Sequence, residues 1–334
     1  MNLQDRVEAF KKLGEKIKAL SKEDIDLLAE RAGQSNAWFT RESVKNALEG
    51  ISFMLEDEKL KKWTSDYSLS EKLPKIVGIV MAGNIPLVGF HDLLCVLISG
   101  HFAAIKPSSD DQFLTSTLVD WILKIEPRLK KNIEIRERLN NTDAVIATGS
   151  DNTARYFEYY FKDIPHVIRK NRTSVAVLDG NESGDEIRDL GVDIFSYFGL
   201  GCRNVSKIFT PKGFDLKECF PHFETFNSII HHHKYRNNYD YHKSIYLVNK
   251  TSHLDTGFLL TVSTDDLVSP ISVLYHQEYD SAETLKKVLK SNEEKIQCIV
   301  GHGYLPLGSA QSPELWDYAD NMDTMEFLTG LKID

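Results

Sequence analysis

The segment YFGLGCRNVSK at residues 197–207 places one thiol, Cys202, directly after a Gly-Leu-Gly run. A cysteine attacks a carbonyl carbon as an accessible thiolate, which a positive charge or a helix N-terminus stabilises. Arg203 supplies a positive charge beside the thiol, and Gly199 and Gly201 leave room for a substrate. The segment therefore fits thiol catalysis, and it also fits a small cysteine in a turn.

The other cysteines and the histidines point less clearly to chemistry. Cys95 lies in an apolar helix-length segment and Cys298 in an apolar strand-like run, so we expect both in the core, whereas Cys219 is expected on a surface helix. No CxxC pair is present, which favours reduced thiols. The triplet HHH at 231–233 points in different directions, so we expect no metal site. His302 is expected to line an active cleft or to fill a turn.

Size and charge narrow the class of protein. A chain of 334 residues is long enough for two ordinary domains. It carries 40 basic and 49 acidic residues, a net charge of −9, which argues against a nucleic-acid-binding surface. Residues 1–20 mix charged and apolar positions without a long apolar run, so we expect no signal peptide, no membrane span and a cytoplasmic protein.

Helices and strands alternate in the first half of the chain. Residues 1–65 have apolar positions three and four apart, which predicts several amphipathic helices with Ser21 and Ser35 as N-caps. From residue 75 onward, short β-like runs alternate with helix-length segments, and this alternation predicts a mostly parallel, doubly wound sheet. The strands are expected at 75–80, 101–106, 143–149 and 166–170, and the helices at 86–100, 111–125 and 151–161.

A second alternating set follows. Its expected strands are 174–180, 204–210, 258–264, 271–276 and 295–300, and its expected helices lie at 183–198, near 215–230 and at 283–290. Residues 231–243 are polar and aromatic without a clear period, so we expect a surface connection there. The tail at 313–331 is expected to be helical and to pack on the first unit or on another subunit.

Four segments, in this order, resemble the aldehyde dehydrogenase superfamily. They are MAGNIPLVGFHDLLCVLISGHFAAIKPSSD, ATGSDNTARYF, YFGLGCRNVSKIFT and DDLVSPISVLYHQEYDSAETLKKVL. Each motif is weak alone, but their shared order makes coincidence a poor explanation. Within the superfamily, NRTSVAVL and GLGCRNVSKIF are most similar to the LuxC-like acyl-CoA reductases of the bacterial bioluminescence type.

The resemblance implies an α/β, aldehyde-dehydrogenase-like fold with two doubly wound α/β domains and a helical N-terminal region. The expected parts are a helical region at 1–69 packed on the cofactor domain, a dinucleotide-binding domain at 70–173, a catalytic cysteine domain at 174–304, and a C-terminal segment at 305–334 that returns to the cofactor domain or bridges subunits. By analogy with the superfamily, a homo-oligomer is expected.

The resemblance also assigns two catalytic side chains. Cys202 matches the nucleophile, which would attack an acyl thioester and form an acyl-cysteine. Asn84, in AGNIP, matches the asparagine whose amide joins the Cys202 backbone N–H in stabilising the oxyanion. Without a downstream nucleophile, Asn84 would be interpreted as a turn residue beside Gly83 and Pro86.

The cofactor contacts implied by the resemblance begin in the run KPSSD. Lys106 would reach the adenosine ribose, with Ser108 and Ser109 in the same loop; an exposed lysine at a strand end is the alternative. Many NAD-preferring relatives carry a glutamate where this chain has Ser109. Because a carboxylate there repels a 2′-phosphate, its absence favours NADPH, with NADH as the alternative because Asp110 and Asp111 follow.

Further along the chain, Gly149 and Ser150 would place the pyrophosphate at a helix N-terminus, although a plain Gly-Ser cap explains them nearly as well. Asp266 stands where relatives carry the glutamate that holds the nicotinamide ribose, and its side chain is one methylene shorter.

One departure from the superfamily indicates the reaction. The segment VIRKNRTSVAV at 167–177 has no carboxylate to activate water, so hydrolysis of the acyl-enzyme is disfavoured. We therefore expect NADPH-dependent reduction of an acyl-CoA, including long-chain fatty acyl-CoA, to the aldehyde. Arg169, Lys170 and Arg172 either attract a phosphorylated tail of CoA or NADPH, or are solvated.

The expected partners are acyl-CoA or another acyl thioester, and an acyl-transferring protein. Two alternatives stay open. A semialdehyde or acyl-phosphate dehydrogenase would use the same thiol with another leaving group. A non-catalytic binding or assembly relative would account for the short chain and for the reduction of the glycine-rich phosphate turn to TGS.

Overall fold

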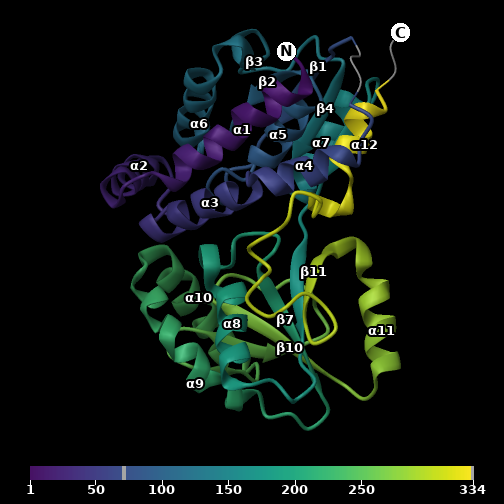
Figure 1. The fold of residues 1–334 in the computed structure, drawn as a ribbon. Helices are drawn as coiled ribbons and strands as arrows, with labels where there is room; N and C mark the ends of the chain where they lie inside the picture. Colours follow the sequence, from purple (N-terminus) through teal and green to yellow (C-terminus); the bar gives the residue numbers. More distant parts are fainter. Residues whose placement is uncertain (70–72, 332–334) are drawn as a thin grey trace. The chain divides into compact units, whose positions relative to one another are not determined.

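The chain forms two compact units in a computed structural model, which describes residues 1–69 and 73–331 (Figure 1). The first unit comprises Met1–Asn171 together with the chain from Pro313, and the second comprises Arg172–Ser312. The expected domain limits stay predictions. The expected limit after residue 69 adjoins residues 70–72, and the expected C-terminal segment ends at 332–334; both stretches lie outside the described residues.

Four amphipathic helices form the N-terminal part of the first unit, as the apolar spacing predicts. They are α1 (Leu3–Lys18), α2 (Lys22–Ser35), α3 (Arg41–Met54) and α4 (Asp57–Ser65). Ser21 caps α2 in a capping box with Asp24, which confirms that prediction. The prediction for Ser35 is wrong, because Ser35 is the last residue of α2 and Thr40 caps α3.

A five-stranded parallel sheet forms the centre of the first unit. Its order is β3 (Ile133–Ile135), β2 (Phe102–Lys106), β1 (Ile76–Val80), β4 (Ala144–Thr148) and β5 (His166–Arg169). The crossover helices are α5 (Phe90–Ile98), α6 (Gln112–Ile125) and α7 (Asp151–Phe161). Strand order reverses between β1 and β4, and open α/β sheets bind ligands at the carboxyl ends of the strands beside such a reversal.

The core of the first unit explains why these segments pack as they do. Every residue of α5 except His91 is buried, as expected for a short helix that is apolar on nearly all sides. The tail is less helical than predicted: α12 (Thr324–Thr329) follows one short 3₁₀ turn (Ala319–Asn321). Helix α12, yellow in Figure 1, packs against α5 within the first unit.

The second unit has a six-stranded sheet that is parallel except for β8. Its order is β11 (Ile296–Gly301), β6 (Thr173–Val177), β7 (Val205–Pro211), β10 (Val273–Tyr279), β9 (Leu260–Ser263) and β8 (Leu254–Asp255). Figure 1 shows α8 (Gly184–Phe195), α9 (Phe220–Phe223) and α10 (His233–Asn249) on one side of the sheet and α11 (Ala282–Ser291) on the other. Both units are therefore layered α/β structures.

Three sequence-based expectations for the second unit are wrong. The expected surface connection at 231–243 is mostly helix α10, whose buried Tyr235 and Tyr239, four residues apart, form a face that its polar composition hides. The helix expected to reach residue 198 ends at Phe195. Cys219 is buried in the core rather than on a surface helix.

A buried ion pair fastens the edge strand β5 to the helix α5. Nη1 of Arg169 lies 2.5 Å from Oδ2 of Asp92, and its Nη2 donates to the Thr324 hydroxyl at 2.7 Å. Arg169 is 3% exposed. The sequence analysis offered two interpretations of Arg169, contact with a phosphorylated tail or exposure to solvent. The buried guanidinium contradicts both. Among the described residues, no helix is both long enough and apolar enough to cross a bilayer.

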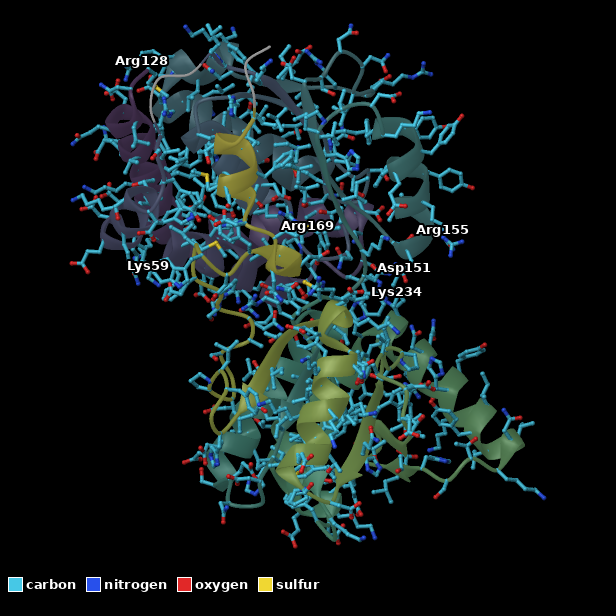
Figure 2. All side chains as sticks on the ribbon, turned by 90° about the vertical axis from the view of Figure 1, so that its right-hand side faces the viewer. Lys59, Arg128, Asp151, Arg155, Arg169 and Lys234 are labelled. Atoms are coloured by element: carbon cyan, nitrogen blue, oxygen red, sulfur yellow. The ribbon has the colours of Figure 1, made fainter. Side chains whose placement is uncertain are left out.

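Replacing Arg169 with Met should destabilise the first unit strongly. The change leaves Asp92 buried without its cation, which typically costs about 3–5 kcal/mol of unfolding free energy. Urea denaturation followed by tryptophan fluorescence measures the loss. The matched control is Arg128→Met, because Arg128 pairs with Glu126 and Asp5 at the surface and lies at the periphery in Figure 2. Equal losses in the two variants would contradict the importance of the buried pair.

Candidate functional site

Six predicted site residues lie at one edge of the first sheet. Since β2, β1 and β4 are adjacent and parallel, the segments that follow them all leave from the carboxyl edge. In register, Val80 at the end of β1 pairs with Lys106 at the end of β2. The residues brought to this edge are Asn84, Lys106, Ser108, Ser109, Gly149 and Ser150.

The Asn84 loop, defined as residues 81–89, interlocks with the loop that follows β2. A Cβ on Gly83 would lie 2.5 Å from Oγ of Ser108, so only glycine fits this close approach. The buried Asn36, at the end of α2, donates from Nδ2 to the Gly83 carbonyl at 3.1 Å. The N-terminal helices thus help to hold the loop from which the exposed Asn84 extends.

The turn after β4 has the geometry of a helix cap. Oγ of Ser150 accepts a hydrogen bond from the Thr153 N–H at 3.3 Å at the start of α7. The Gly149 N–H donates to the carbonyl of Arg169 on the neighbouring strand. The capping role of Ser150 is therefore observed, and a pyrophosphate at this helix N-terminus stays a prediction. Lys106 is exposed at the end of β2, where it is available to a ligand at the edge.

The Cys202 turn is built around a buried asparagine that the sequence analysis missed. Oδ1 of Asn204 accepts from the Gly201 N–H at 2.8 Å, and the Asn204 N–H donates to the Gly201 carbonyl at 3.1 Å. Nδ2 of Asn204 donates to the carbonyls of Ser196 at 2.7 Å and Asp193 at 3.1 Å. One side chain that is 2% exposed therefore ties the turn to the end of α8.

Strain and a second hydrogen bond also shape this turn. Tyr197, Phe198 and Gly199 have φ of 50°, 59° and 80°, so two bulky residues adopt the left-handed conformation at a cost of about 1–3 kcal/mol each. Oγ of Ser174, on β6, donates to the Cys202 carbonyl at 3.1 Å and accepts from the Cys298 N–H at 3.2 Å. Cys202 itself is half-buried. The arrangement fixes the backbone on both sides of the thiol.

A buried lysine holds the loop that carries Asp266. Nζ of Lys207 donates to the carbonyls of Thr264 at 2.9 Å and Asp266 at 3.0 Å. Lys207 is 1% exposed, and burial lowers its pKa to about 8. Lys207 lies on β7, five residues after Cys202. Strand β7 therefore follows the Cys202 turn and holds the Asp266 loop through the Lys207 side chain. The sequence signal was a lone lysine in the apolar run VSKIF.

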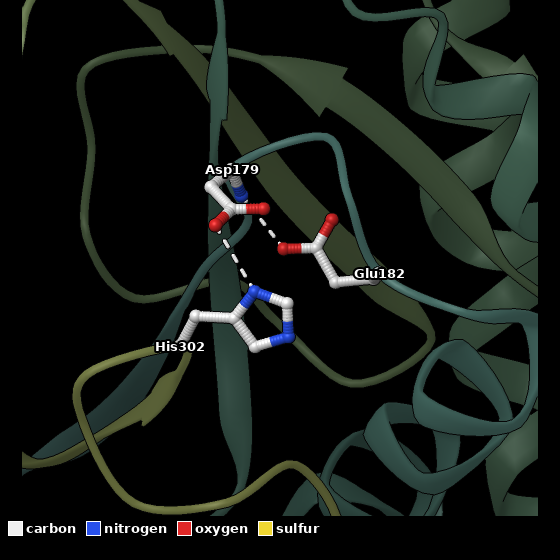
Figure 3. Close-up of side chains that lie close together, drawn as sticks. All are labelled: Asp179, Glu182 and His302. Carbon is white, nitrogen blue, oxygen red and sulfur yellow. Dashed lines mark hydrogen bonds and ion pairs between the residues drawn. The ribbon is translucent and has the colours of Figure 1, made fainter.

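His302 belongs to an ion-pair network on the second unit (Figure 3). Its Nε2 lies 2.9 Å from Oε1 of Glu186, and its Nδ1 lies 3.0 Å from Oδ2 of Asp179. These two carboxylates, Glu186 first, raise the pKa of His302 to about 9. Asp179, Glu182 and His302 each offer one possible metal-ligand atom, and these three atoms lie within 4.8 Å of one another. The raised pKa favours an imidazolium beside these carboxylates, and the expected absence of a metal stays a prediction.

The fold is that of aldehyde dehydrogenases. Matching solved structures include aldehyde dehydrogenase 21 of Physcomitrella patens with succinate, at 12% identity and a TM-score of 0.62, over 90% of this chain and 74% of that chain. The NAD+ complex of the Bacillus cereus aldehyde dehydrogenase matches at 14% identity and a TM-score of 0.64, over 90% of this chain and 72% of that chain. An NAD-dependent aldehyde dehydrogenase of Sinorhizobium meliloti matches at 11% identity and a TM-score of 0.66, over 90% of this chain and 70% of that chain. These identities establish the fold class expected from the sequence: an α/β, aldehyde-dehydrogenase-like chain.

The sequence comparison is more specific. Residues 3–219 match the model of the family described as acyl-CoA reductase (LuxC), so the chain belongs to that family. It is thus an oxidoreductase of the acyl-reductase class, as its resemblance implied. No curated protein sequence matches the chain significantly. Six predicted site residues lie in the first unit and two, Cys202 and Asp266, in the second.

Replacing Asn204 with Ala should loosen the Cys202 turn. The change leaves the Gly201 N–H and the carbonyls of α8 without their partner, which costs about 1–3 kcal/mol of unfolding free energy. Urea denaturation and the rate of Cys202 alkylation by iodoacetamide are the measurements. Asn227→Ala is the matched control, since exposed Asn227 donates from Nδ2 to the exposed Glu224 carboxylate. Identical stability and alkylation in the two variants would show that Asn204 does not shape the turn.

Replacing His302 with Gln should change the pH dependence of stability. The pKa of His302 is raised from 6.5 to about 9 in the folded state, so its contribution is fully present below pH 6.5 and is lost as the pH rises through about 9. We expect the thermal midpoints of wild type and His302→Gln to differ at pH 6 and to converge at pH 10. A difference that is constant across this range would contradict the ion-pair interpretation.

Proposed function

We propose that this protein reduces an acyl-CoA thioester to the aldehyde, through an acyl-cysteine at Cys202, with NADPH as the hydride donor. The observation that carries the proposal is the construction of the Cys202 turn in a chain of the acyl-CoA reductase family. Buried polar side chains and a strained backbone hold the half-buried thiol in a defined position. Strained backbone and buried polar groups lower the stability of the fold, so their presence beside Cys202 supports a functional role for its thiol.

In the first step, the Cys202 thiolate attacks the thioester carbonyl carbon. A carbon–sulfur bond forms and the carbonyl π electrons move to oxygen, giving a tetrahedral oxyanion. The Asn84 amide and the Cys202 N–H would donate to that oxygen; one such donor contributes about 3 kcal/mol to the transition state. The oxyanion then collapses, and CoA leaves with the electron pair of its carbon–sulfur bond and takes a proton.

In the second step, the acyl-cysteine is reduced rather than hydrolysed. The acyl carbon of the acyl-cysteine would accept a hydride, which a nicotinamide would supply when bound. Asn84 would again stabilise the oxyanion, and cleavage of the bond to Cys202 would release the aldehyde and regenerate the thiolate. The segment at 167–177 has no carboxylate that could activate water, which supports reduction over hydrolysis.

The cofactor assignment rests on the carboxyl edge of the first sheet. Gly83 packs closely on Ser108, Gly149 packs on Phe157 and Thr153, and Ser150 is the N-cap of α7, whose N-terminal amides face this edge. Lys106, Ser108, Ser109, Gly149 and Ser150 would hold the adenosine and phosphate groups, and Asp266 the nicotinamide ribose. Related folds are described as NAD+ complexes, which supports a nicotinamide cofactor. A hydroxyl at Ser109 instead of a carboxylate favours NADPH over NADH.

The proposal also covers the roles of the two expected domains, the oligomeric state and the source of the acyl group. Residues 70–173 would bind the dinucleotide, residues 174–304 would carry the nucleophile, and a homo-oligomer would form. An acyl-transferring protein would supply the acyl group where free acyl-CoA does not.

Steady-state NADPH oxidation tests the proposal with acyl-CoAs of increasing chain length. Cys202→Ala should abolish turnover while the protein stays folded, and Asn84→Ala should lower kcat by about 10²–10³-fold. Cys219→Ala is the matched control, because burial raises the pKa of that thiol to about 12 and makes it inert. Turnover with an acyl phosphate but with no acyl-CoA would overturn the choice of acyl donor, and normal turnover by Cys202→Ala would overturn the mechanism.

A further inference from the structure

Asp111 is a buried carboxylate that the proposed chemistry leaves unused. It lies between β2 and α6, directly after the KPSSD run, and is 3% exposed. Its Oδ2 accepts a hydrogen bond from the backbone N–H of Leu87 at 2.8 Å. Leu87 belongs to the Asn84 loop, so a residue of the β2 loop holds the loop that follows β1.

The residue that Asp111 holds is strained. Leu87 has φ of 56°, which places a branched side chain in the left-handed region at a cost of about 1–3 kcal/mol. Such a conformation persists only where its surroundings fix it. The Asp111 carboxyl gives this N–H a buried acceptor, and the hydrogen bond is roughly twice as strong when the carboxyl is ionised as when it is neutral.

Asn84 lies between two fixed points of its loop. On its N-terminal side, Gly83 packs on Ser108 and accepts the hydrogen bond from Asn36. On its C-terminal side, Leu87 is held by Asp111. With both sides fixed, the backbone at Asn84 has few conformations open to it, and its side chain is presented in one direction.

Helix capping does not account for the acid at position 111. Asp111 precedes α6 as its N-cap but makes no capping hydrogen bond to that helix in the described structure. Burial raises its pKa to about 7, against the opposing effects of the Leu87 N–H and of a hydrogen bond with the Thr115 side chain, and its Oδ1 has no hydrogen-bond partner among the described residues. A half-satisfied buried carboxyl is costly, and of its two partners only the Leu87 N–H belongs to the Asn84 loop, so this contact is the feature that needs a reason.

We propose that Asp111 is the positioning residue for Asn84, fixing the strained Leu87 so that the Asn84 amide is preorganised for the oxyanion. This inference rests on the proposed oxyanion role of Asn84. Asp111 touches neither thioester nor cofactor and acts through the loop. Its own N–H donates to the Ser108 carbonyl at 3.2 Å, so the same residue links the Asn84 loop to the expected cofactor loop.

The test measures acylation separately from cofactor binding. Wild type, Asp111→Ala and the isosteric Asp111→Asn are mixed with acyl-CoA without cofactor, and the release of free CoA is followed in a single turnover. Asp110→Ala is the matched control, because Asp110 is the adjacent exposed aspartate, whereas the Leu87 N–H donates to Asp111. Calorimetry gives the NADPH dissociation constant of each variant.

We expect Asp111→Ala to slow acylation by about tenfold or more, as misplacement of an oxyanion donor does. Asp111→Asn keeps an acceptor oxygen and should recover part of the rate, whereas Asp110→Ala should match wild type. The NADPH dissociation constant should change less than twofold in the two Asp111 variants. Since Asp111 acts through Asn84, the double variant Asn84→Ala/Asp111→Ala should be no slower than Asn84→Ala alone.

Two results would overturn the inference. One is an acylation rate in Asp111→Ala equal to that of wild type. The other is a double variant whose loss equals the product of the two single losses, which would show that Asp111 acts independently of Asn84. If wild type releases no CoA, the proposed function fails, and hydrogen exchange of residues 82–89 decides the inference. Faster exchange in Asp111→Ala than in Asp110→Ala supports the inference, and equal exchange overturns it.

Discussion

Parallel pairing of β1 with β2 and with β4 is the constraint on which the first unit depends. Parallel strands end at one edge, so the loops at 81–89, 107–111 and 149–150 must leave the sheet side by side. The buried Asp92–Arg169 pair then fastens the first turn of α5 to the end of β5. The sheet thereby brings the loops together, and individual contacts between loops set the direction of each side chain.

The two units fix their loops in different ways. In the first unit, a glycine that admits no Cβ and a buried acid hold the Asn84 loop. In the second unit, Asn204, Ser174 and Lys207 hold the Cys202 turn and the Asp266 loop by hydrogen bonds to backbone groups. Buried polar groups are stabilising only when they are partnered, so these side chains also specify one backbone conformation. Asp111 holds the strained Leu87 directly, and Asn204 bonds backbone groups of Ser196 and Gly201 on either side of the strained Tyr197 and Phe198.

Much of the fold could be predicted from the sequence because short apolar runs alternate with helical periods. β3 was missed because three residues carry no period, and α10 because its polar composition hides two buried tyrosines. Family motifs indicate Cys202 and Asn84. Asn204, Lys207 and Asp111 could not be assigned, because each bonds backbone groups of another element: the end of α8, the Asp266 loop and the Asn84 loop. Arg169 was misinterpreted for the same reason, since Asp92 lies on another element of the fold.

The central claim is that Cys202 takes the acyl group from a thioester, and its most direct test needs no hydride donor. The folded protein is incubated with acyl-CoAs of several chain lengths, and intact and peptide mass spectra are recorded. We predict one acyl adduct per protein molecule, confined to the peptide that contains Cys202, and a preference for acyl groups of one length. An adduct at another residue, or none with any acyl-CoA from a folded protein, would contradict the account.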